Sequence, residues 1–129
     1  MTILSGFSDL FYSAMRFVAG FLFACHGAQK LFGVLGGPQM LHIPMMLAAG
    51  IIEFVGGVLI ALGVFTTFAA FIASGEMAFG YFTGHAPHGF WPILNHGELA
   101  VLYCFVFLYI ASRGDGAWSL RRLAKGKRP

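Results

Sequence analysis

Apolar residues run through most of this chain, and four stretches of them are long enough to cross a membrane as helices. They cover residues 11–33, 44–64, 66–84 and 97–113. A membrane-spanning helix needs about 20 mostly apolar residues, within a range of about 17–25. Neither the alternation of a strand nor the period of a soluble amphipathic helix fits these stretches as well. The pattern predicts an all-α fold: one domain with four antiparallel transmembrane helices and a basic tail over 114–129.

The connections between these segments are short and differ in character. Residues 34–43 form an uncharged loop, and only a few residues join the second segment to the third. We expect Thr66 or Thr67 to cap the start of the third segment, because their hydroxyls can accept a hydrogen bond from a free backbone N–H. The longest loop, 85–96, contains two prolines that argue against a continuous helix there.

Charge is scarce and unevenly placed. Hydrophobic residues make up 58 % of the chain and charged residues 10 %, whereas a soluble domain has about 25 % charged residues. Five of the eight Lys and Arg residues lie in the last nine positions. A basic tail can bind nucleic acid, but beside an apolar segment we interpret it as a cytoplasmic topology signal. With four crossings, both termini are then predicted to be cytoplasmic, and the partner is the lipid bilayer rather than a nucleic acid.

Ionisable residues inside the apolar segments are the main candidates for function. Such residues are rare in membrane spans and usually face the interior of the protein or a water-filled cavity. At about 1.5 Å per residue, a set of them falls in the outer half of the membrane, although neighbouring segments run in opposite directions. This polar cluster consists of His26, Lys30, Glu53, Glu76 and Glu98. Arg16 lies apart, near the inner face, where we expect a structural role. Small residues, including Gly20, Gly27 and Gly80, share the helix faces of these ionisable residues, so we expect the helices to pack closely through small residues.

The start of the fourth segment offers a partner for Lys30. Glu98 lies at a positive helix N-terminus, which favours the ionised carboxylate, so we expect it to be the best partner for Lys30. A structural role for Asn95 and Glu98 in capping the helix is an equally good interpretation. The outer loop would form the mouth of any site, through His85, His88, His96 and Trp91.

Three interpretations of the polar cluster stay open. In the first, Lys30 and a glutamate form a buried ion pair, and the other acids only fix helix packing. In the second, the cluster binds a small polar or quinone-like ligand, and His26 with a glutamate moves protons to and from it. In the third it holds a metal ion, but the Glu-x-x-His pairs typical of helical bundles are missing. We therefore expect no metal, and we expect Cys25 and Cys104 to be unreactive apolar thiols.

Several short motifs, taken together, resemble the DoxX family of small bacterial membrane proteins over about residues 13–120. They are Arg16, Gly20-Phe21, 26–33 (His-Gly-Ala-Gln-Lys-Leu-Phe-Gly), 50–53 (Gly-Ile-Ile-Glu) with Gly56-Gly57, 75–78 (Gly-Glu-Met-Ala), 89–92 (Gly-Phe-Trp-Pro), Asn95-x-Gly97-Glu98 and Gly114-x-Gly116-x-Trp118-Ser119. The chain departs from the family pattern at His96, where glycine is usual, and at Asp115 and Arg121 in the tail. The resemblance implies a four-helix bundle in a bacterial inner membrane and an association with redox chemistry, since the founding members are subunits of a thiosulfate:quinone oxidoreductase.

These observations support three hypotheses about function. The first is a redox-associated membrane subunit that binds a quinone or similar molecule, or docks an oxidoreductase partner. The second is a non-catalytic scaffold or stress-response protein, and the third is a small transporter. Whether the chain is an enzyme, and whether it forms a homo-oligomer, stays open. No covalently bound cofactor is expected, because the chain carries no haem, flavin or iron–sulfur motif.

Overall fold

The computed structural model describes residues 2–129, in which every regular element is a helix and there is no strand. The prediction of an all-α chain is therefore confirmed. The long helical elements are α1 (Ser8–Phe32), the continuous run of α2 (Pro44–Ile51), η2 (Ile52–Gly56) and α3 (Gly57–Leu62), then α4 (Thr66–Gly84) and α6 (Glu98–Arg113). The short ones are η1 (Ser5–Phe7), η3 (Ala86–His88), α5 (Pro92–Asn95) and α7 (Leu120–Ala124). Each predicted apolar segment thus falls on a long helical element.

The second helical run contains a feature that the hydropathy pattern does not predict. It begins at Pro44, which suits the first position of a helix because proline lacks an N–H that would otherwise be unpaired. Its middle part, η2, is a π-helix of five residues that includes Glu53. A π-helical turn is wider than an α-helical one and occurs often at functional sites. Glu53 therefore lies on a locally distorted stretch of an otherwise regular helix.

The turn between α3 and α4 corrects our prediction of the helix cap. Gly63 and Phe65 both have positive φ angles, 73° and 50°, and so make a very tight turn. Thr66 is consequently already helical, and its backbone N–H donates to Asp115 Oδ1 at 3.2 Å. The prediction that Thr66 or Thr67 caps this helix is wrong, because a carboxylate from the distant tail serves that purpose.

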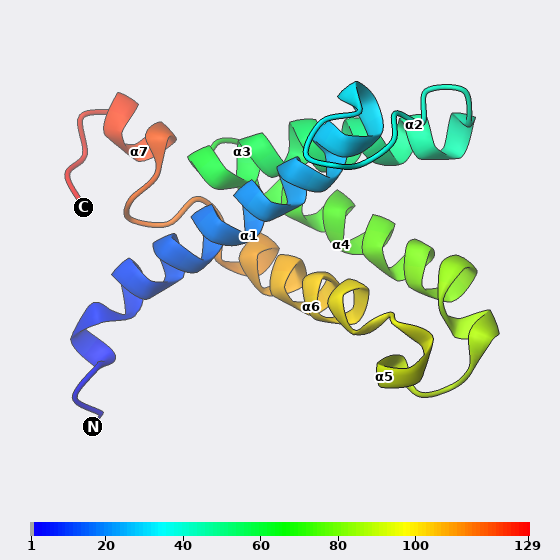
Figure 1. The fold of residues 1–129 in the computed structure, drawn as a ribbon. Helices are drawn as coiled ribbons and strands as arrows, with labels where there is room; N and C mark the ends of the chain where they lie inside the picture. Colours follow the sequence, from blue (N-terminus) through cyan, green and yellow to red (C-terminus); the bar gives the residue numbers. More distant parts are fainter. Residues whose placement is uncertain (1) are drawn as a thin grey trace.

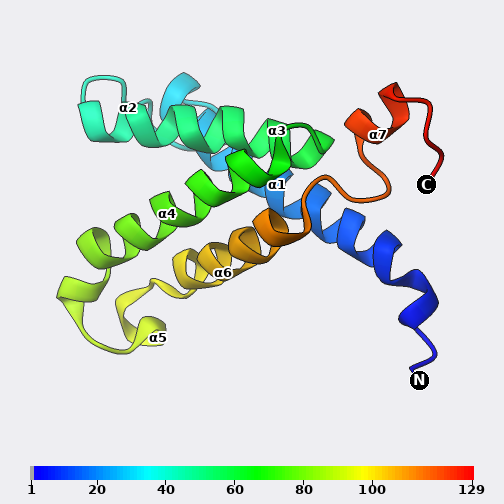
Figure 2. The ribbon, with the colours of Figure 1, turned by 180° about the vertical axis from the view of Figure 1, so that it is seen from behind.

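Two helix pairs make up the fold. Helix α1 packs along α2, η2 and α3, and α4 packs along α6, as both views show (Figures 1 and 2). The first pair is held close by glycines: a Cβ on Gly20 would lie 2.5 Å from the backbone N of Ala61, and one on Gly27 would lie 2.3 Å from that of Phe54. The expected close approach through small residues is confirmed for this pair.

Aromatic rings join the two helix pairs at the centre. Phe23 of α1 is almost fully buried, and its ring centroid lies 4.7 Å from that of Phe107 and 5.6 Å from that of Tyr103 on α6. Helix α4 contributes small residues instead, so that α6 can lie close to it. The buried apolar core comprises Tyr12, Ala19, Phe23, Ile60, Ala69, Ala70, Ala73, Tyr103, Phe107 and Ile110.

The chain termini and the loops lie at opposite ends of the molecule. The N-terminus, the α3–α4 turn and α7 lie at one end, and the loop before α2 and the loops on either side of α5 lie at the other (Figures 1 and 2). An ion pair of 2.8 Å between Arg113 and Asp9 joins the end of α6 to the start of α1. These two ends are the tail end and the loop end of the molecule.

Arg16 fastens the tail end from within. Its side chain is only 2 % exposed, and Nη1 donates to the carbonyl oxygens of Ile60 at 2.6 Å and Ala61 at 2.8 Å. Its Nη2 donates to the Trp118 carbonyl at 2.7 Å. Carbonyl groups at the end of a helix carry partial negative charge and lack the usual i+4 donor, so a buried guanidinium can bond to them favourably. The contacts of Arg16 are those of a structural residue.

Large apolar side chains are exposed on every long helical element. Two helical stretches, Ser5–Phe32 and Pro44–Leu62, are long and apolar enough to cross a membrane. Helices α4 and α6 also expose large apolar side chains, including Phe68 at 70 % and Phe105 at 65 %. Extensive exposed apolar surface is unusual on a soluble monomer and marks contact with lipid or with another protein.

Candidate functional site

Lys30 and Glu53 form an ion pair near the loop end. Lys30 Nζ lies 2.6 Å from Glu53 Oε1 and 2.5 Å from Oε2, and the two side chains are 23 % and 3 % exposed. Lys30 follows Gly27 by about one helical turn on α1, and Glu53 lies on η2 across the glycine contact. The close packing of these two helices thus brings the charges together.

The expected pairing of Lys30 with Glu98 is wrong. Glu98 is the first residue of α6, its side chain is exposed, and no ion pair involving it is present within residues 2–129. Glu98 also lines neither of the cavities described below. Four members of the predicted cluster come together around these cavities, and Glu98 lies outside them.

Glu76 faces a cavity of about 320 Å³ beside the ion pair. One of its carboxylate oxygens, Oε2, is buried and has no hydrogen-bond partner in the described chain. Most buried polar atoms are paired, so an unpaired carboxylate oxygen needs an explanation such as a bound ligand or water. The cavity is lined by Lys30, Met45, Met46, Ala49, Glu53, Glu76, Met77, Phe79, Gly80, Thr83, Gly84, His85 and Ala100.

Small residues of α4 create this space. Gly80 lies one turn after Glu76, and a Cβ added to it would meet nothing within 4 Å. The expectation that Gly80 helps to bring two helices together is therefore wrong. Its missing side chain leaves room for the cavity instead.

A second cavity, of about 220 Å³, lies next to the first and shares Glu53, Met77, His85 and Ala100 with it. It is also lined by Phe23, His26, His96, Leu99 and Tyr103. The rings of His26 and Tyr103 lie edge to face, with centroids 6.4 Å apart. The walls therefore combine imidazole, phenol and carboxylate groups with apolar side chains, a combination that can hydrogen-bond a flat ligand and exchange protons with it.

Asn95 organises the loop that closes the second cavity. It is 3 % exposed; its Oδ1 accepts from the Gly97 N–H, and its Nδ2 donates to the Gly89 carbonyl, each at 2.9 Å. Gly97, not Asn95, is the N-cap residue of α6. His96 has a positive φ of 61°, a conformation in which glycine is unstrained. This conformation would suit the glycine that the resemblance leads us to expect at this position, and His96 lines the second cavity.

The four predicted mouth residues divide into two groups. His85 and His96 line the cavities, and His85 Nδ1 lies 3.0 Å from the Asn95 carbonyl oxygen. His88 and Trp91 are exposed and line neither cavity. Met77, which both cavities share, was not singled out from the sequence, because a methionine in an apolar helix gives no signal. No group of three or more His, Cys, Asp or Glu side chains within residues 2–129 is arranged to hold a metal ion.

Comparison with known proteins identifies the family. The DoxX family profile matches residues 11–86. A Haemophilus influenzae protein, described as uncharacterized, is 43 % identical over 127 residues, which cover 93 % of this chain and 95 % of that protein. The chain belongs to the DoxX family. The resemblance found in its sequence motifs is thereby confirmed, and no solved structure matches this chain.

As a DoxX-family chain, this is a membrane protein, and its exposed apolar surface is in keeping with contact with a lipid bilayer. The family match includes the three residues at the centre of the first cavity, Lys30, Glu53 and Glu76. It ends before Glu98 and before the tail. The Haemophilus protein is similar over nearly the whole chain, so the fold described here applies to both at the level of the helices.

Proposed function

We propose that this DoxX-family protein crosses a bacterial inner membrane four times, with both termini in the cytoplasm. The tail end carries the basic residues of α7 and the C-terminus, whereas the loops 33–43 and 85–97 contain no Lys or Arg. The excess of Lys and Arg on cytoplasmic segments sets membrane orientation. The grouping of both termini at the tail end, opposite the two loops, supports an even number of crossings (Figure 1).

Within this topology, the cavity beside Glu76 is a binding site for a quinone or a similar small molecule. The observation that carries this proposal is the buried Glu76 Oε2, which has no partner and lines an open cavity. At about 320 Å³, the cavity is at the low end of the range of about 300–1,000 Å³ for small-molecule sites. It would hold a ring-sized headgroup, while an isoprenoid tail stays in the lipid. Methionines in its wall can adapt to a flat ring.

The chemistry proposed for the site is proton transfer coupled to redox change elsewhere. Reduction of a quinone to a quinol takes two electrons and two protons. In this proposal Glu76 would deliver one proton from the first cavity, and His26 would supply the other from the second cavity. The electrons would come from an oxidoreductase partner docked on the membrane protein. In this proposal the chain is the quinone-binding subunit of a redox assembly.

A structural role for the cluster is the second candidate function, and the Lys30–Glu53 pair favours it. Both carboxylate oxygens of Glu53 contact Lys30 Nζ, so this pair is complete without a ligand. A scaffold protein could use it to fix the register of α1 against η2. This candidate does not account for Glu76, whose buried oxygen the ion pair does not reach. The two candidates therefore differ in what they predict for Glu76.

Replacing Glu76 with methionine should weaken quinone binding by about two- to tenfold, since the hydrogen bond that the protonated carboxyl donates to a quinone oxygen contributes about 0.5–1.5 kcal/mol. Binding of a water-soluble short-chain ubiquinone analogue to the protein in lipid nanodiscs can be measured by calorimetry. Glu98→Met is the matched control, because Glu98 is exposed and lines neither cavity. Absence of saturable binding to the unmodified protein, or equal affinity of the two variants, would reject the site and favour the scaffold.

A further inference from the structure

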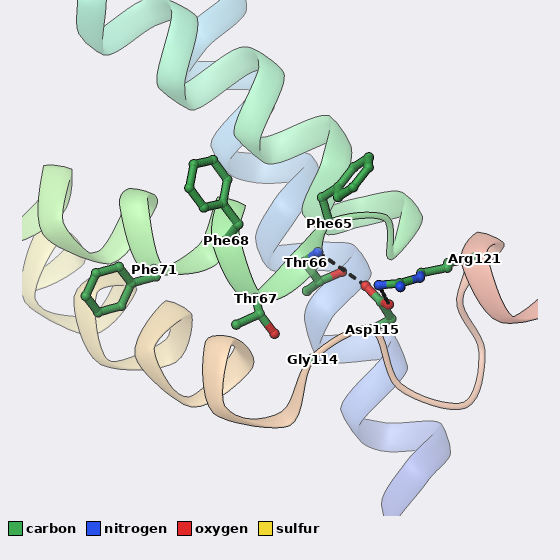
Figure 3. Close-up of a pocket in the computed structure, with 8 residues that line it drawn as sticks. All are labelled: Phe65, Thr66, Thr67, Phe68, Phe71, Gly114, Asp115 and Arg121. Atoms are coloured by element: carbon green, nitrogen blue, oxygen red, sulfur yellow. Dashed lines mark hydrogen bonds and ion pairs between the residues drawn. The ribbon is translucent and has the colours of Figure 1, made fainter.

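The tail end carries a second pair of adjoining cavities, unrelated to the polar cluster. The first, of about 420 Å³, runs beside the start of α4. Its wall is largely aromatic, formed by the exposed rings of Phe65, Phe68 and Phe71, and it ends at Asp115 and Arg121 (Figure 3). Threonine side chains and Gly114 complete it. This cavity is thus apolar along α4 and charged at the end nearest the tail.

The second cavity, of about 410 Å³, continues from that charged end and is basic. It shares Asp115 and Arg121 with the first cavity and is further lined by Gly116, Ser119, Arg122, Lys125 and Lys127. Asp115 is already engaged, because it accepts from the Thr66 N–H and pairs with Arg121 at 3.3 Å. No carboxylate within residues 2–129 forms an ion pair with the other three cations. Positive charge therefore exceeds negative charge in this cavity.

Hydrogen bonds hold the tail in this position. Ser119 is 1 % exposed; its Oγ donates to the Gly116 carbonyl at 3.1 Å and accepts from the Arg122 N–H at 3.2 Å. The Trp118 carbonyl accepts from the buried Arg16, as described above. The basic side chains are thus carried on a segment fixed to the membrane domain. A tail that only signalled orientation would need no such attachment.

We propose that these joined cavities bind one anionic phospholipid. Its phosphate would lie among Arg121, Arg122 and Lys125, and an acyl chain would lie along the phenylalanines of α4. Guanidinium groups bind phosphate oxygens through paired N–H donors, and anionic lipids attract basic segments at the cytoplasmic surface. A soluble phosphate compound would use the basic cavity but leave the aromatic wall empty. The ligand that matches both parts is amphipathic, and this proposal needs only the membrane location, not the quinone site.

The test measures which lipid surrounds Trp118. In a Trp91→Phe background Trp118 is the only tryptophan, and its backbone is fixed beside the basic cavity. The full chain is placed in phosphatidylcholine vesicles that contain a small fraction of brominated phosphatidylglycerol, at about 0.15 M salt, where charges beyond about 8 Å are largely screened. We expect quenching to show that the site prefers phosphatidylglycerol to phosphatidylcholine by at least about tenfold. Each nearby Lys or Arg raises the affinity for an anionic lipid by about fivefold.

Two variants with the same net charge separate a defined site from general surface charge. Arg122→Gln with Lys125→Gln removes two cations from the cavity, and Arg113→Gln with Arg128→Gln removes two that line neither cavity. The first double variant should bring the preference for phosphatidylglycerol close to unity. The second double variant should change this preference by less than about twofold. Equal losses in both, or no preference in the starting protein, would overturn the proposal. Displacement by millimolar glycerol phosphate, which lacks acyl chains, would overturn it as well.

Discussion

Replacing Lys30 with methionine should lower the free energy of unfolding by about 3–5 kcal/mol, because it leaves the carboxylate of Glu53 buried without a partner. Glu53 is 3 % exposed and both of its oxygens contact Lys30. Thermal or denaturant unfolding of the protein in detergent, followed by circular dichroism, measures this loss. Changing Glu53 to glutamine in the same chain should recover most of it, since the pair then carries no charge at all.

A cycle of the two single variants and the double variant isolates this interaction. Neighbouring residues in one ion pair show coupling energies of about 0.5–3 kcal/mol. We expect a coupling at the upper end, because the pair is largely buried and makes two contacts. Additive effects of the two substitutions would contradict the pairing, and Lys30 would then need another explanation for its place in an apolar helix.

Replacing Gly27 with alanine should also lower the free energy of unfolding. The Cβ of the alanine would lie 2.3 Å from the backbone N of Phe54 and 2.8 Å from the carbonyl oxygen of Gly50. Backbone atoms cannot move aside as a flexible side chain can, so α1 would have to shift away from η2. Overpacking of this kind costs about 1–3 kcal/mol and sometimes more. The shift would also separate Lys30, one turn after Gly27, from Glu53. We therefore expect the free energy of unfolding to fall by about 3 kcal/mol or more.

Gly75→Ala is the matched control for this substitution. Gly75 is also inside a long helix, but a Cβ there would meet nothing within 4 Å. Alanine favours a helix over glycine by up to about 1 kcal/mol, so Gly75→Ala should leave the unfolding midpoint unchanged or raise it. If both substitutions had the same effect, the close contact between α1 and η2 would not be the reason for glycine at position 27.

The helices could be predicted from the sequence because their signals are local. Apolar runs, Pro44 and the loop prolines locate the helical elements to within a few residues. The glycines at positions 20 and 27 correctly predicted a close helix contact, since a whole face of small residues has few other uses in a membrane protein. The cap of α4 could not be predicted in this way. It is supplied by Asp115, 49 residues from Thr66 in the chain, and no local pattern connects them.

The candidate site was predictable in its residue types but not in its pairing. Depth along the helices placed Lys30 near three glutamates, and the choice among them depends on rotation about each helix axis. The π-helical turn at η2 changes that rotation for Glu53, and hydropathy carries no information about it. Glu98 is at a similar depth but on the exposed side of α6. The cavity itself follows from the open space at Gly80, which in sequence looks like any other packing glycine.

Filling this cavity tests most directly whether it is a binding site. Gly80→Leu places an apolar side chain in the open space without changing any charge, and Gly75→Leu adds the same side chain at an exposed position of α4 that lines no part of the cavity. The affinity for the short-chain ubiquinone analogue is then measured for both folded variants. The account predicts that Gly80→Leu, whose side chain would occupy space needed by the ring, loses at least about tenfold in affinity, or about 1.4 kcal/mol, while Gly75→Leu binds as the unmodified protein does. Unchanged binding by Gly80→Leu would contradict it.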